Sequence, residues 1–475
     1  MSLSEKPLSE TADPVILDSA GIPAIIATQR QYFNSGKTRS LSFRQGQLQA
    51  LKSAIQRHET QILAALKQDF GKSSFEAYAT EVGFVLDELS YTLKHLAEWV
   101  EPEDVKTPMM HQPASSQIVY EPYGVALIIA PWNYPFQLLI APLIGAIAAG
   151  NCAVVKPSEL TPATARVIAE LIRNTFDPHY VIAIEGGVEA SQELLDQQFD
   201  YIFFTGGIQV GRIVMEKAAK YLTPLTLELG GKSPCIVDRG VPLEITARRI
   251  VWGKFLNAGQ TCVAPDYVLV PPEMKVDLIQ EMARCLKEFY GADPRQSPDY
   301  ARIVNEAHFE RLTRQIRPEQ VAVGGQSDRT ERYIAPTILS PVDWDDPLMQ
   351  DELFGPLLPV LSYRSLEEVI EQIQSRPRPL ALYLFSENKA HQQLVTNRLS
   401  FGGGCINDTM IHLATPYLPF GGVGTSGMGG YHGRFSFEAF SHRKALMSRP
   451  LKLDLPLRYP PYPGWKEKIV RQIMK

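Results

Sequence analysis

The sequence predicts an α/β protein built on doubly wound parallel sheets. From Gln117 onward, short runs rich in β-branched residues alternate with segments of helical periodicity. Such strand–helix–strand repetition is typical of parallel sheets, which bind ligands beyond the carboxyl ends of their strands. The chain has 475 residues and 45% hydrophobic content, which suits about two to four folded domains and excludes a disordered chain.

The first hundred residues are predicted to be helical. Apolar residues recur there at helical spacing, as at Leu48, Leu51 and Ile55, and the pattern changes after Pro102. The candidate strands that follow are Val125–Ile129, Ala153–Lys156, Tyr180–Ile184, Tyr201–Thr205, Leu225–Leu229 and Cys235–Val237.

Helices are predicted between these strands. Thr161 and Pro162 provide an N-cap and a first-turn proline for a helix through about Phe176, and Val210 to Tyr221 is again helical. A second α/β block is expected from Gly231 to Met428, ending in a glycine-dense segment.

One long stretch, from Pro122 to Val155, contains no charged residue. Its prolines, among them Pro131, Pro135 and Pro142, argue against a membrane-spanning helix, because each removes a backbone donor that lipid cannot replace. We therefore expect a buried strand, a loop and a helix.

Charge and cysteine content limit the function further. The 47 basic and 52 acidic residues leave no positive field for nucleic acid. The five cysteines are widely spaced, without a C-x-x-C pair, which favours a reducing compartment and gives no metal site. Residues 1–25 show no basic segment followed by an apolar one, so we expect a loose arm, no secretory signal and a cytoplasmic protein.

Cys262 is the first candidate for chemistry. It follows Asn257-Ala-Gly-Gln-Thr, where Gly259 and small neighbours would leave its thiol accessible to a substrate carbonyl. A lone cysteine is more often a small buried hydrophobe, and this interpretation holds for the other four.

Glu228 and Asn133 are the next candidates. Glu228 ends a predicted strand between Leu227 and Leu229, and apolar surroundings would raise its pKa toward that of a general base. Asn133 lies between two prolines in the uncharged stretch, where it is either a turn residue or an amide donor for an oxyanion.

Two further segments suit a nucleotide. Lys156-Pro-Ser-Glu159 ends a strand before a helix, and Phe204 to Gly211 forms a glycine-bearing strand-to-helix turn. That turn lacks the G-x-G-x-x-G spacing, so it is a weak phosphate motif by itself.

Together and in this order, these segments resemble the aldehyde dehydrogenase superfamily over about residues 30 to 450. Details at Gly259–Tyr267, Gly427–Gly433 and Arg458–Tyr462 are similar to the class 3 branch, which includes the fatty aldehyde dehydrogenases. The matching segments are Pro131–Phe136, Lys156–Glu159, Phe204–Gly211, Glu228–Pro234, Gly259–Cys262, Glu352–Pro356 and Pro419–Gly427.

The resemblance implies a role for each residue. Cys262 would be the nucleophile and Glu228 the general base, while Asn133 and the backbone N–H of Cys262 would form an oxyanion hole. The residues implied to bind the cofactor are Trp132, Lys156, Glu159, Gly206, Gly207, Gly211, Glu352 and Phe354. Gly207 departs from the family pattern, since many members have Ser or Asn there, which puts one phosphate contact in doubt.

The implied activity is oxidation of a medium-chain, long-chain or aromatic aldehyde to the acid through a thioester on Cys262. The presence of Glu228 favours hydrolysis over transfer to coenzyme A, and a non-catalytic or lipid-binding protein on this fold is the other alternative. Glu159 should repel a 2′-phosphate, so NAD is expected first and NADP second.

The resemblance also implies an architecture. Residues 1–111 and 132–230 would form the cofactor domain, 231–428 the catalytic domain, and 112–131 with 429–450 a bridging segment that usually makes dimers. The tail, 451–475, interleaves apolar and basic residues from Trp465 to Lys475, so it would either lie on a membrane surface or pack on its own body or a partner subunit.

Overall fold

The computed structural model describes residues 21–454 and 456–474. Most of the predicted loose arm at the N-terminus and the last residue of the predicted basic tail, Lys475, lie outside the described residues. The first described part is helical, as predicted. It consists of α1 (Gly21–Asn34), α2 (Leu41–Phe70), α3 (Ser74–Ala77), the π-helical turn η2 (Tyr78–Val82) and α4 (Gly83–Trp99).

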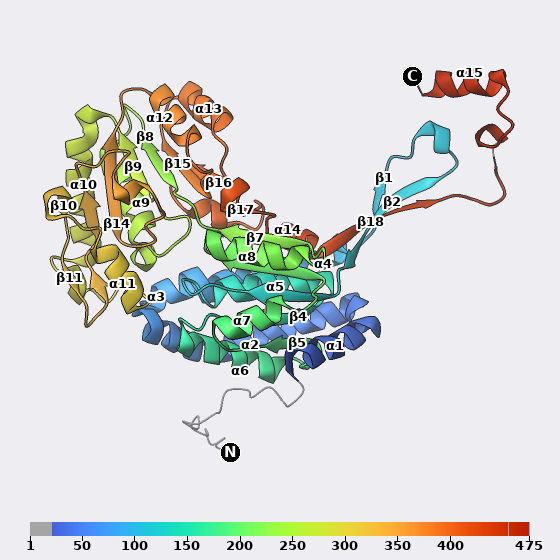
Figure 1. Ribbon diagram of the computed structural model, residues 1–475, viewed down its shortest axis with the longest axis horizontal. Coiled ribbons are helices and arrows are strands. Elements are labelled where there is room, and N and C mark those ends of the chain that lie inside the picture. The colour runs from blue at the N-terminus through green and yellow to red at the C-terminus, as the bar shows by residue number, and fades with distance from the viewer. Residues whose placement is uncertain (1–20, 455, 475) are drawn as a thin grey trace, which may run out of the picture.

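A six-stranded sheet follows, in the order β17-β7-β6-β3-β4-β5 (Figure 1). Its pairs are parallel except for β17, which returns from the far end of the chain and runs antiparallel to β7. The strands are β3 (Val125–Ile129), β4 (Cys152–Lys156), β5 (Val181–Ala183), β6 (Tyr201–Gly206), β7 (Leu225–Leu229) and β17 (Gly427–Met428). The accompanying helices are α5 (Gln137–Ala149), α6 (Pro162–Thr175), α7 (Val188–Leu195) and α8 (Ile208–Ala219). The predicted strands are therefore confirmed to within two residues.

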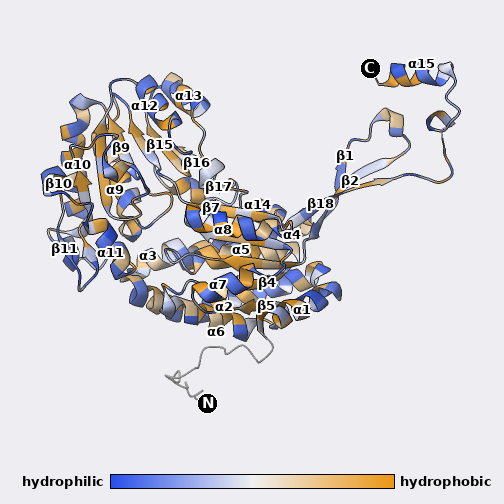
Figure 2. Cartoon of the chain, viewed as in Figure 1, coloured by the Kyte–Doolittle hydropathy of each residue, from blue (hydrophilic) through white to orange (hydrophobic). Residues whose placement is uncertain are grey.

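A second sheet of seven strands has the order β10-β13-β14-β9-β8-β15-β16, and only its β10–β13 pair is antiparallel. The strands are β8 (Pro234–Val237), β9 (Tyr267–Val270), β10 (Val321–Val323), β13 (Thr337–Leu339), β14 (Leu357–Ser362), β15 (Ala381–Phe385) and β16 (Gly403–Ile406), with the small pair β11 (Ser327–Asp328) and β12 (Tyr333–Ile334) beside them. Its helices are α9 (Leu243–Phe255), α10 (Pro272–Tyr290), α11 (Glu306–Thr313), α12 (Leu366–Gln374) and α13 (Lys389–Arg398). In both sheets the hydrophobic strands lie inside and the polar helix faces point outward (Figure 2). The prediction of an α/β fold with parallel sheets is confirmed.

A three-stranded antiparallel sheet projects from the body as an arm, which comprises β1 (Glu103–Val105), β2 (Ser115–Pro122) and β18 (Ser441–Ser448) (Figure 1). The short helix α14 (Arg434–Ala439) leads into β18, and α15 (Gly464–Ile473) lies beyond the tip of the arm. The stretch 112–131 was predicted as one bridging segment. It contributes β2 to the arm and β3 to the six-stranded sheet, so the change of sheet falls between Pro122 and Val125.

The uncharged stretch consists of β3, α5 and β4, which are buried throughout. Strands that are covered on both faces are typically continuous apolar runs, which explains why this part of the sequence carries no charge. Among the described residues, no helix has the length and apolar character needed to span a membrane.

The start of α6 differs from the prediction. Thr161 occupies the N-cap position, but its side chain makes no capping hydrogen bond. Instead, the buried carboxylate of Asp69 in α2 accepts the N–H groups of Ala163 at 3.2 Å and Thr164 at 2.9 Å, and also the Thr164 hydroxyl at 2.7 Å. A carboxylate satisfies the free donors of a first helical turn and complements the helix dipole, so the cap comes from a distant helix.

Candidate active site

Cys262 follows a turn whose backbone is left-handed at three successive residues, Asn257, Ala258 and Gly259. Only Gly259 adopts this conformation without strain. A Cβ at Gly259 would also lie 2.3 Å from the carbonyl oxygen of Gly355, so the site requires glycine for space as well. Non-glycine residues in this region are uncommon and are held there by surrounding contacts.

Gln260 supplies several of those contacts from a fully buried side chain. Its amide donates to the carbonyl oxygens of Asn257 and Arg302, both at 3.0 Å, and its side-chain oxygen accepts the N–H of Val304 at 3.0 Å. Gln260 therefore ties the turn before Cys262 to the segment that precedes α11. The sequence analysis did not single out this role.

Asn133 lies beside the same turn, although 127 residues separate it from Gln260. Its side-chain amide donates to the carbonyl oxygen of Gln260 at 3.1 Å. Its own carbonyl oxygen accepts the Asn257 amide at 2.8 Å and the Lys72 ammonium at 3.2 Å. The structure thus brings the predicted amide donor next to the predicted nucleophile.

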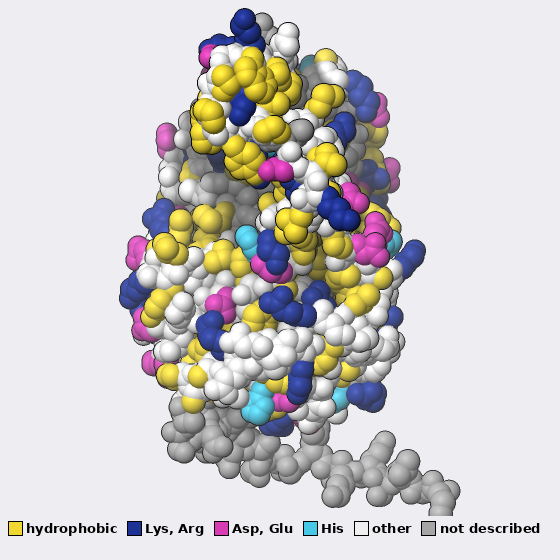
Figure 3. Space-filling model, turned by 90° about the vertical axis from the view of Figure 1, so that its right-hand side faces the viewer, with side chains coloured by type: hydrophobic (Ala, Val, Ile, Leu, Met, Phe, Trp, Pro, Cys, Tyr) yellow, Lys and Arg dark blue, Asp and Glu magenta, His cyan; other side chains and the backbone are white. Residues whose placement is uncertain are grey.

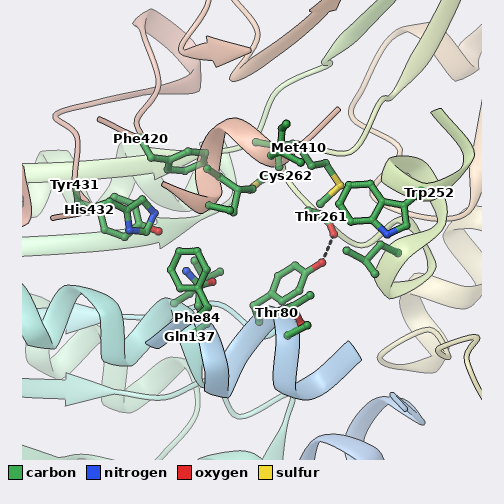
Figure 4. Close-up of a pocket in the computed structure, with 18 residues that line it drawn as sticks. Thr80, Phe84, Gln137, Trp252, Thr261, Cys262, Met410, Phe420, Tyr431 and His432 are labelled. Atoms are coloured by element: carbon green, nitrogen blue, oxygen red, sulfur yellow. Dashed lines mark hydrogen bonds between the residues drawn. The ribbon is translucent and has the colours of Figure 1, made fainter. Parts of the chain in front are cut away.

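Two pockets meet at Cys262. The first, which we call the apolar pocket, has a volume of about 240 Å³ and opens among hydrophobic and aromatic side chains (Figure 4). The second, which we call the polar pocket, has a volume of about 210 Å³ and lies on the side of the six-stranded sheet. Both pockets are lined by Cys262, Leu138, Phe420 and Tyr431, so the thiol is accessible from either side.

The walls of the apolar pocket come from distant parts of the chain. Phe84 of α4 lies opposite Phe420, while Trp252 of α9 and Met410 lie on the other side of Cys262 (Figure 4). Two polar groups on this wall, the hydroxyls of Tyr134 and Thr261, share a hydrogen bond of 2.7 Å, and most of the other lining side chains are apolar. The pocket therefore suits an apolar group.

Glu228 lines the polar pocket from β7, with only 3% of its surface exposed. Among the described residues, neither of its carboxyl oxygens has a hydrogen-bond partner. Burial raises the pKa of Glu228 well above its ordinary value, in the direction that the sequence predicts. In its ionised form, a buried carboxylate with both oxygens free is able to take a proton from a water molecule.

The thiol itself is not activated by its protein surroundings. Burial raises the pKa of Cys262 to about 12, and the neighbouring carboxyl groups of Glu352 and Glu228 add to the rise. At neutral pH the thiol in this arrangement is protonated, so attack on a carbonyl carbon requires a base for its proton.

Four of the predicted residues lie at the carboxyl ends of adjacent strands. Asn133 follows β3, Lys156 ends β4, Gly206 ends β6 and Glu228 precedes the last residue of β7. These parallel strands are neighbours in the order β7-β6-β3-β4, so their ends meet at one edge of the sheet. This edge is where open α/β sheets bind their ligands.

The other predicted cofactor residues divide into two groups. The polar pocket is lined by Trp132, Gly206, Gly207, Glu352 and Phe354. Lys156 and Glu159 lie outside this lining and form an ion pair of 2.7 Å one strand further along the edge. Gly211 lies in α8 and is also outside the lining. It packs against Leu229, since an added Cβ at Gly211 would lie 2.5 Å from that side chain.

His308 and Arg311 of α11 also line the polar pocket, although their sequence gives no sign of this. The His308 ring lies 5.0 Å from the Trp132 ring, and Arg311 donates to the carbonyl oxygen of Leu353 at 2.7 Å. They occur in an ordinary amphipathic helix, and no local motif distinguishes them from surface residues.

A cysteine at the junction of two pockets, beside an amide donor and a buried carboxyl group, defines a thiol-dependent enzyme on a nucleotide-binding α/β fold. Residues 10–446 match the family model described as the aldehyde dehydrogenase family. The chain belongs to this family and is an aldehyde dehydrogenase.

Similar proteins come from bacteria and mammals. The 4,4'-diaponeurosporen-aldehyde dehydrogenase of Staphylococcus aureus is 52% identical, over 94% of this chain and 97% of that protein. The dimeric, NADP-preferring aldehyde dehydrogenase of Rattus norvegicus is 48% identical, over 94% and 99%. The aldehyde dehydrogenase family 3 member B2 of Mus musculus is 47% identical, over 94% of each chain, which confirms the similarity to the class 3 branch.

Solved structures agree with these relatives. The substrate-bound state of Staphylococcus aureus AldH superimposes with a TM-score of 0.94 at 51% identity, covering 96% of this chain and 99% of that one. The expected fold class is therefore confirmed.

Proposed function

We propose that the protein oxidises apolar aldehydes to carboxylic acids with NAD(P), through a thioester on Cys262. The observation that carries this proposal is the position of Cys262 at the junction of the two pockets. An aldehyde in the apolar pocket and a cofactor in the polar pocket would approach the same sulfur atom from opposite sides.

The first step is attack by sulfur on the aldehyde carbon. The new C–S bond turns the carbonyl oxygen into an alkoxide, while the thiol proton passes to solvent water, which leaves the Glu228 carboxylate available for the second step. The Asn133 amide and the backbone N–H of Cys262 donate to the alkoxide, a contribution that typically amounts to about 10²–10³ in rate for one such donor. Bound NAD(P) would supply the hydride acceptor for this alkoxide. The carbon is then at the oxidation level of a thioester.

The second step is hydrolysis of the thioester. The Glu228 carboxylate takes a proton from water, whose oxygen attacks the thioester carbon. The C–S bond then breaks, the acid is released, and Glu228 returns the proton to the Cys262 sulfur. The unpaired carboxyl oxygens of Glu228 in the polar pocket support this role, because they are free to bind water. A carboxyl group here also favours hydrolysis over the coenzyme A alternative.

Several features of the polar pocket fit a nicotinamide dinucleotide. The Thr205 hydroxyl is buried without a partner among the described residues, and an added Cβ at Gly207 would meet no heavy atom within 4 Å. Open space at a strand-to-helix turn allows a phosphate to approach the backbone N–H groups. We propose that Glu352, Phe354 and Trp132 hold the nicotinamide half, and that Lys156 and Glu159 hold the adenosine ribose.

The proposed cofactor preference is NAD first. The carboxylate of Glu159, with 42% of its side chain exposed, would repel a 2′-phosphate and accept a ribose hydroxyl. Lys156 reduces this repulsion through their ion pair, so NADP remains the second cofactor. The rat relative is named as NADP-preferring, which makes the preference worth measuring directly.

A kinetic panel tests the proposed function. Aldehydes of increasing chain length, and an aromatic aldehyde, are each assayed with NAD and with NADP. We expect kcat/KM to rise with apolar chain length until the apolar pocket is filled. Cys262→Ala should abolish the activity, whereas Cys405→Ala, another partly exposed free thiol, should retain it. Failure of wild-type protein to reduce either cofactor with any of these aldehydes would favour the non-catalytic alternative.

We also propose a homodimer formed through the arm, with residues 1–111 and 132–230 as the cofactor domain and 231–428 as the catalytic domain. The rat relative is named as dimeric, and an isolated three-stranded arm needs a second surface to bury its apolar side chains. A cytoplasmic location is proposed because all five cysteines are free.

The tail has two kinds of candidate contact: a protein surface, either its own body or a partner subunit, and an anionic membrane surface. Trp465, Ile473 and Met474 of the tail are exposed, which suits either. Lys466 is turned inward, where its ammonium donates to the carbonyl oxygens of Pro456 and Tyr459, so fewer cations face outward than the sequence suggests. Co-sedimentation with anionic vesicles, with and without residues 451–475, distinguishes the two contacts.

A further inference from the structure

Glu76 is a buried carboxyl group that lines neither pocket. It lies in α3 and is 6% exposed. Its Oε1 accepts the backbone N–H of Asn257 at 2.9 Å, across 181 residues of sequence. Nothing in the reaction described above uses this group, and it touches neither substrate nor cofactor space.

The N–H that Glu76 accepts belongs to the first residue of the left-handed turn before Cys262. The side-chain amide of Asn257 donates to the carbonyl oxygens of Asn133 at 2.8 Å and Gln260 at 3.2 Å. Asn257 therefore links the turn before Cys262 to the segment that contains Asn133. A buried N–H without an acceptor is costly, so loss of the Glu76 oxygen would favour other conformations of this turn.

The segment around Glu76 also contacts the backbone next to Asn133. Lys72, in the linker between α2 and α3, donates to the carbonyl oxygen of Asn133 at 3.2 Å and pairs with Glu81 at 2.7 Å. Both side chains of this ion pair are fully buried. Glu81 in turn accepts the N–H of Phe136 at 2.9 Å. One short segment thus binds both backbone regions that must converge on the reacting carbon.

The segment continues into the wall of the apolar pocket. The hydroxyl of Thr80 donates to the carbonyl oxygen of Glu76 at 2.7 Å, and Thr80 lines that pocket in the π-helical turn η2 (Figure 4). Single π-helical turns within helices occur frequently at functional sites. The backbone of Glu76 is therefore bonded to a turn that lines the apolar pocket.

We propose that Glu76 is a positioning residue, whose hydrogen bond to the N–H of Asn257 holds the Cys262 turn in register with Asn133. The proposal rests on the proposed reaction, because its effect is measured in the first turnover. A displacement of about 1 Å at reacting atoms costs about 10² in rate, which sets the size of the expected effect.

The test is a stopped-flow measurement of the first-turnover burst of reduced cofactor. Glu76→Met removes the acceptor at similar volume, and we expect the burst rate constant to fall about 10²-fold while KM for the aldehyde changes less than threefold. Glu76→Gln keeps an acceptor oxygen, and its burst rate constant should stay within threefold of the wild-type value. If Glu76→Met does not fold, Glu76→Asp replaces it. Its side chain is one methylene shorter, so the carboxyl oxygen no longer reaches the N–H of Asn257, and we expect the same fall in the burst rate constant.

A matched control separates positioning from stability. Asp238 is also buried, at 3% exposure, and accepts the N–H of Arg239 at 2.8 Å outside both pockets. Asp238→Ala should lower the unfolding midpoint and leave the burst rate constant unchanged. A merely structural role for Glu76 would lower the burst amplitude, which counts folded sites, and not the rate constant.

Two results would overturn the proposal. The first is a wild-type burst rate constant in Glu76→Met, and the second is a Glu76→Gln variant as slow as Glu76→Met, which would point to charge and not to the hydrogen bond. Failure of the proposed function would show in the wild-type protein itself, so it is distinguished from failure of this inference.

Discussion

Lys156 and Glu159 form the ion pair in which we expect one side chain to separate two cofactors. The ammonium is 2% exposed and the carboxylate 42%, so only the carboxylate reaches solvent at the edge of the sheet. A 2′-phosphate placed there would meet this negative charge, whereas a ribose hydroxyl would find an acceptor. The preference between NAD and NADP is therefore expected to reside mainly in Glu159.

Glu159→Gln tests this expectation. Removal of the charge should raise kcat/KM for NADP relative to NAD by about tenfold, since one like-charge contact near a protein surface is worth about 1 kcal/mol or more. Steady-state kinetics with both cofactors provide the ratio, and Glu189→Gln, on α7, serves as a surface control. An unchanged ratio of kcat/KM values would show that Glu159 does not discriminate between NAD and NADP.

The candidate site could be predicted from sequence where its residues lie in local motifs. Cys262, Glu228 and Asn133 each have informative neighbours, and the structure brings all three to one place. Gln260, Lys72 and Glu76 act through backbone groups 42 to 181 residues away, and no local pattern carries that information. His308 and Arg311 were missed because they occupy the inner side of an otherwise ordinary helix.

At the scale of elements, the long central strands were predictable because strands covered on both faces are continuous apolar runs. The short strands β10 to β13 were not, since two or three residues give no measurable periodicity. Thr161 holds the predicted N-cap position of α6, but the capping hydrogen bonds come from Asp69, and this could not be predicted for a related reason. A capping residue at the helix start can be recognised from its position in the sequence. The contact of Asp69 with α6 cannot, because Asp69 lies 95 positions before Thr164.

The role of Asp69 is testable by substitution. Asp69→Ala removes three hydrogen bonds at the start of α6 and should reduce the free energy of unfolding by about 2 kcal/mol, as for other helix caps. Urea denaturation followed by circular dichroism gives the midpoint. Asp87→Ala, at an exposed position of α4, is the control and should leave the midpoint nearly unchanged. Equal unfolding midpoints for the two variants would show that Asp69 does not stabilise the start of α6.

At the scale of the whole molecule, the arm is the part that projects from the body (Figure 1). Hydrophobic side chains gather on the face that carries the arm and α15 (Figure 3). Leu446 and Met447 of β18 are 47% and 53% exposed, and β18 lies at an edge of its sheet. An exposed edge strand with apolar side chains is a template for pairing with another chain.

Charging this edge should therefore prevent dimer formation. The double variant Leu446→Lys and Met447→Lys is expected to sediment as a monomer at micromolar concentration, because lysines on an edge strand oppose pairing. Val276→Lys, at a position 63% exposed on α10, should sediment like the wild-type protein. A double variant that keeps the dimer mass would exclude β18 from the interface.

The most direct test of covalent catalysis by Cys262 is mass spectrometry of Glu228→Gln after reaction with NAD and an apolar aldehyde. Without the base, hydrolysis should slow by about 10²–10⁴ and the thioester should accumulate after one burst of reduced cofactor. We predict a mass increase equal to the aldehyde less two hydrogens, located on the peptide that contains Cys262. An unmodified protein after the burst, or an acyl group on another cysteine, would contradict the mechanism.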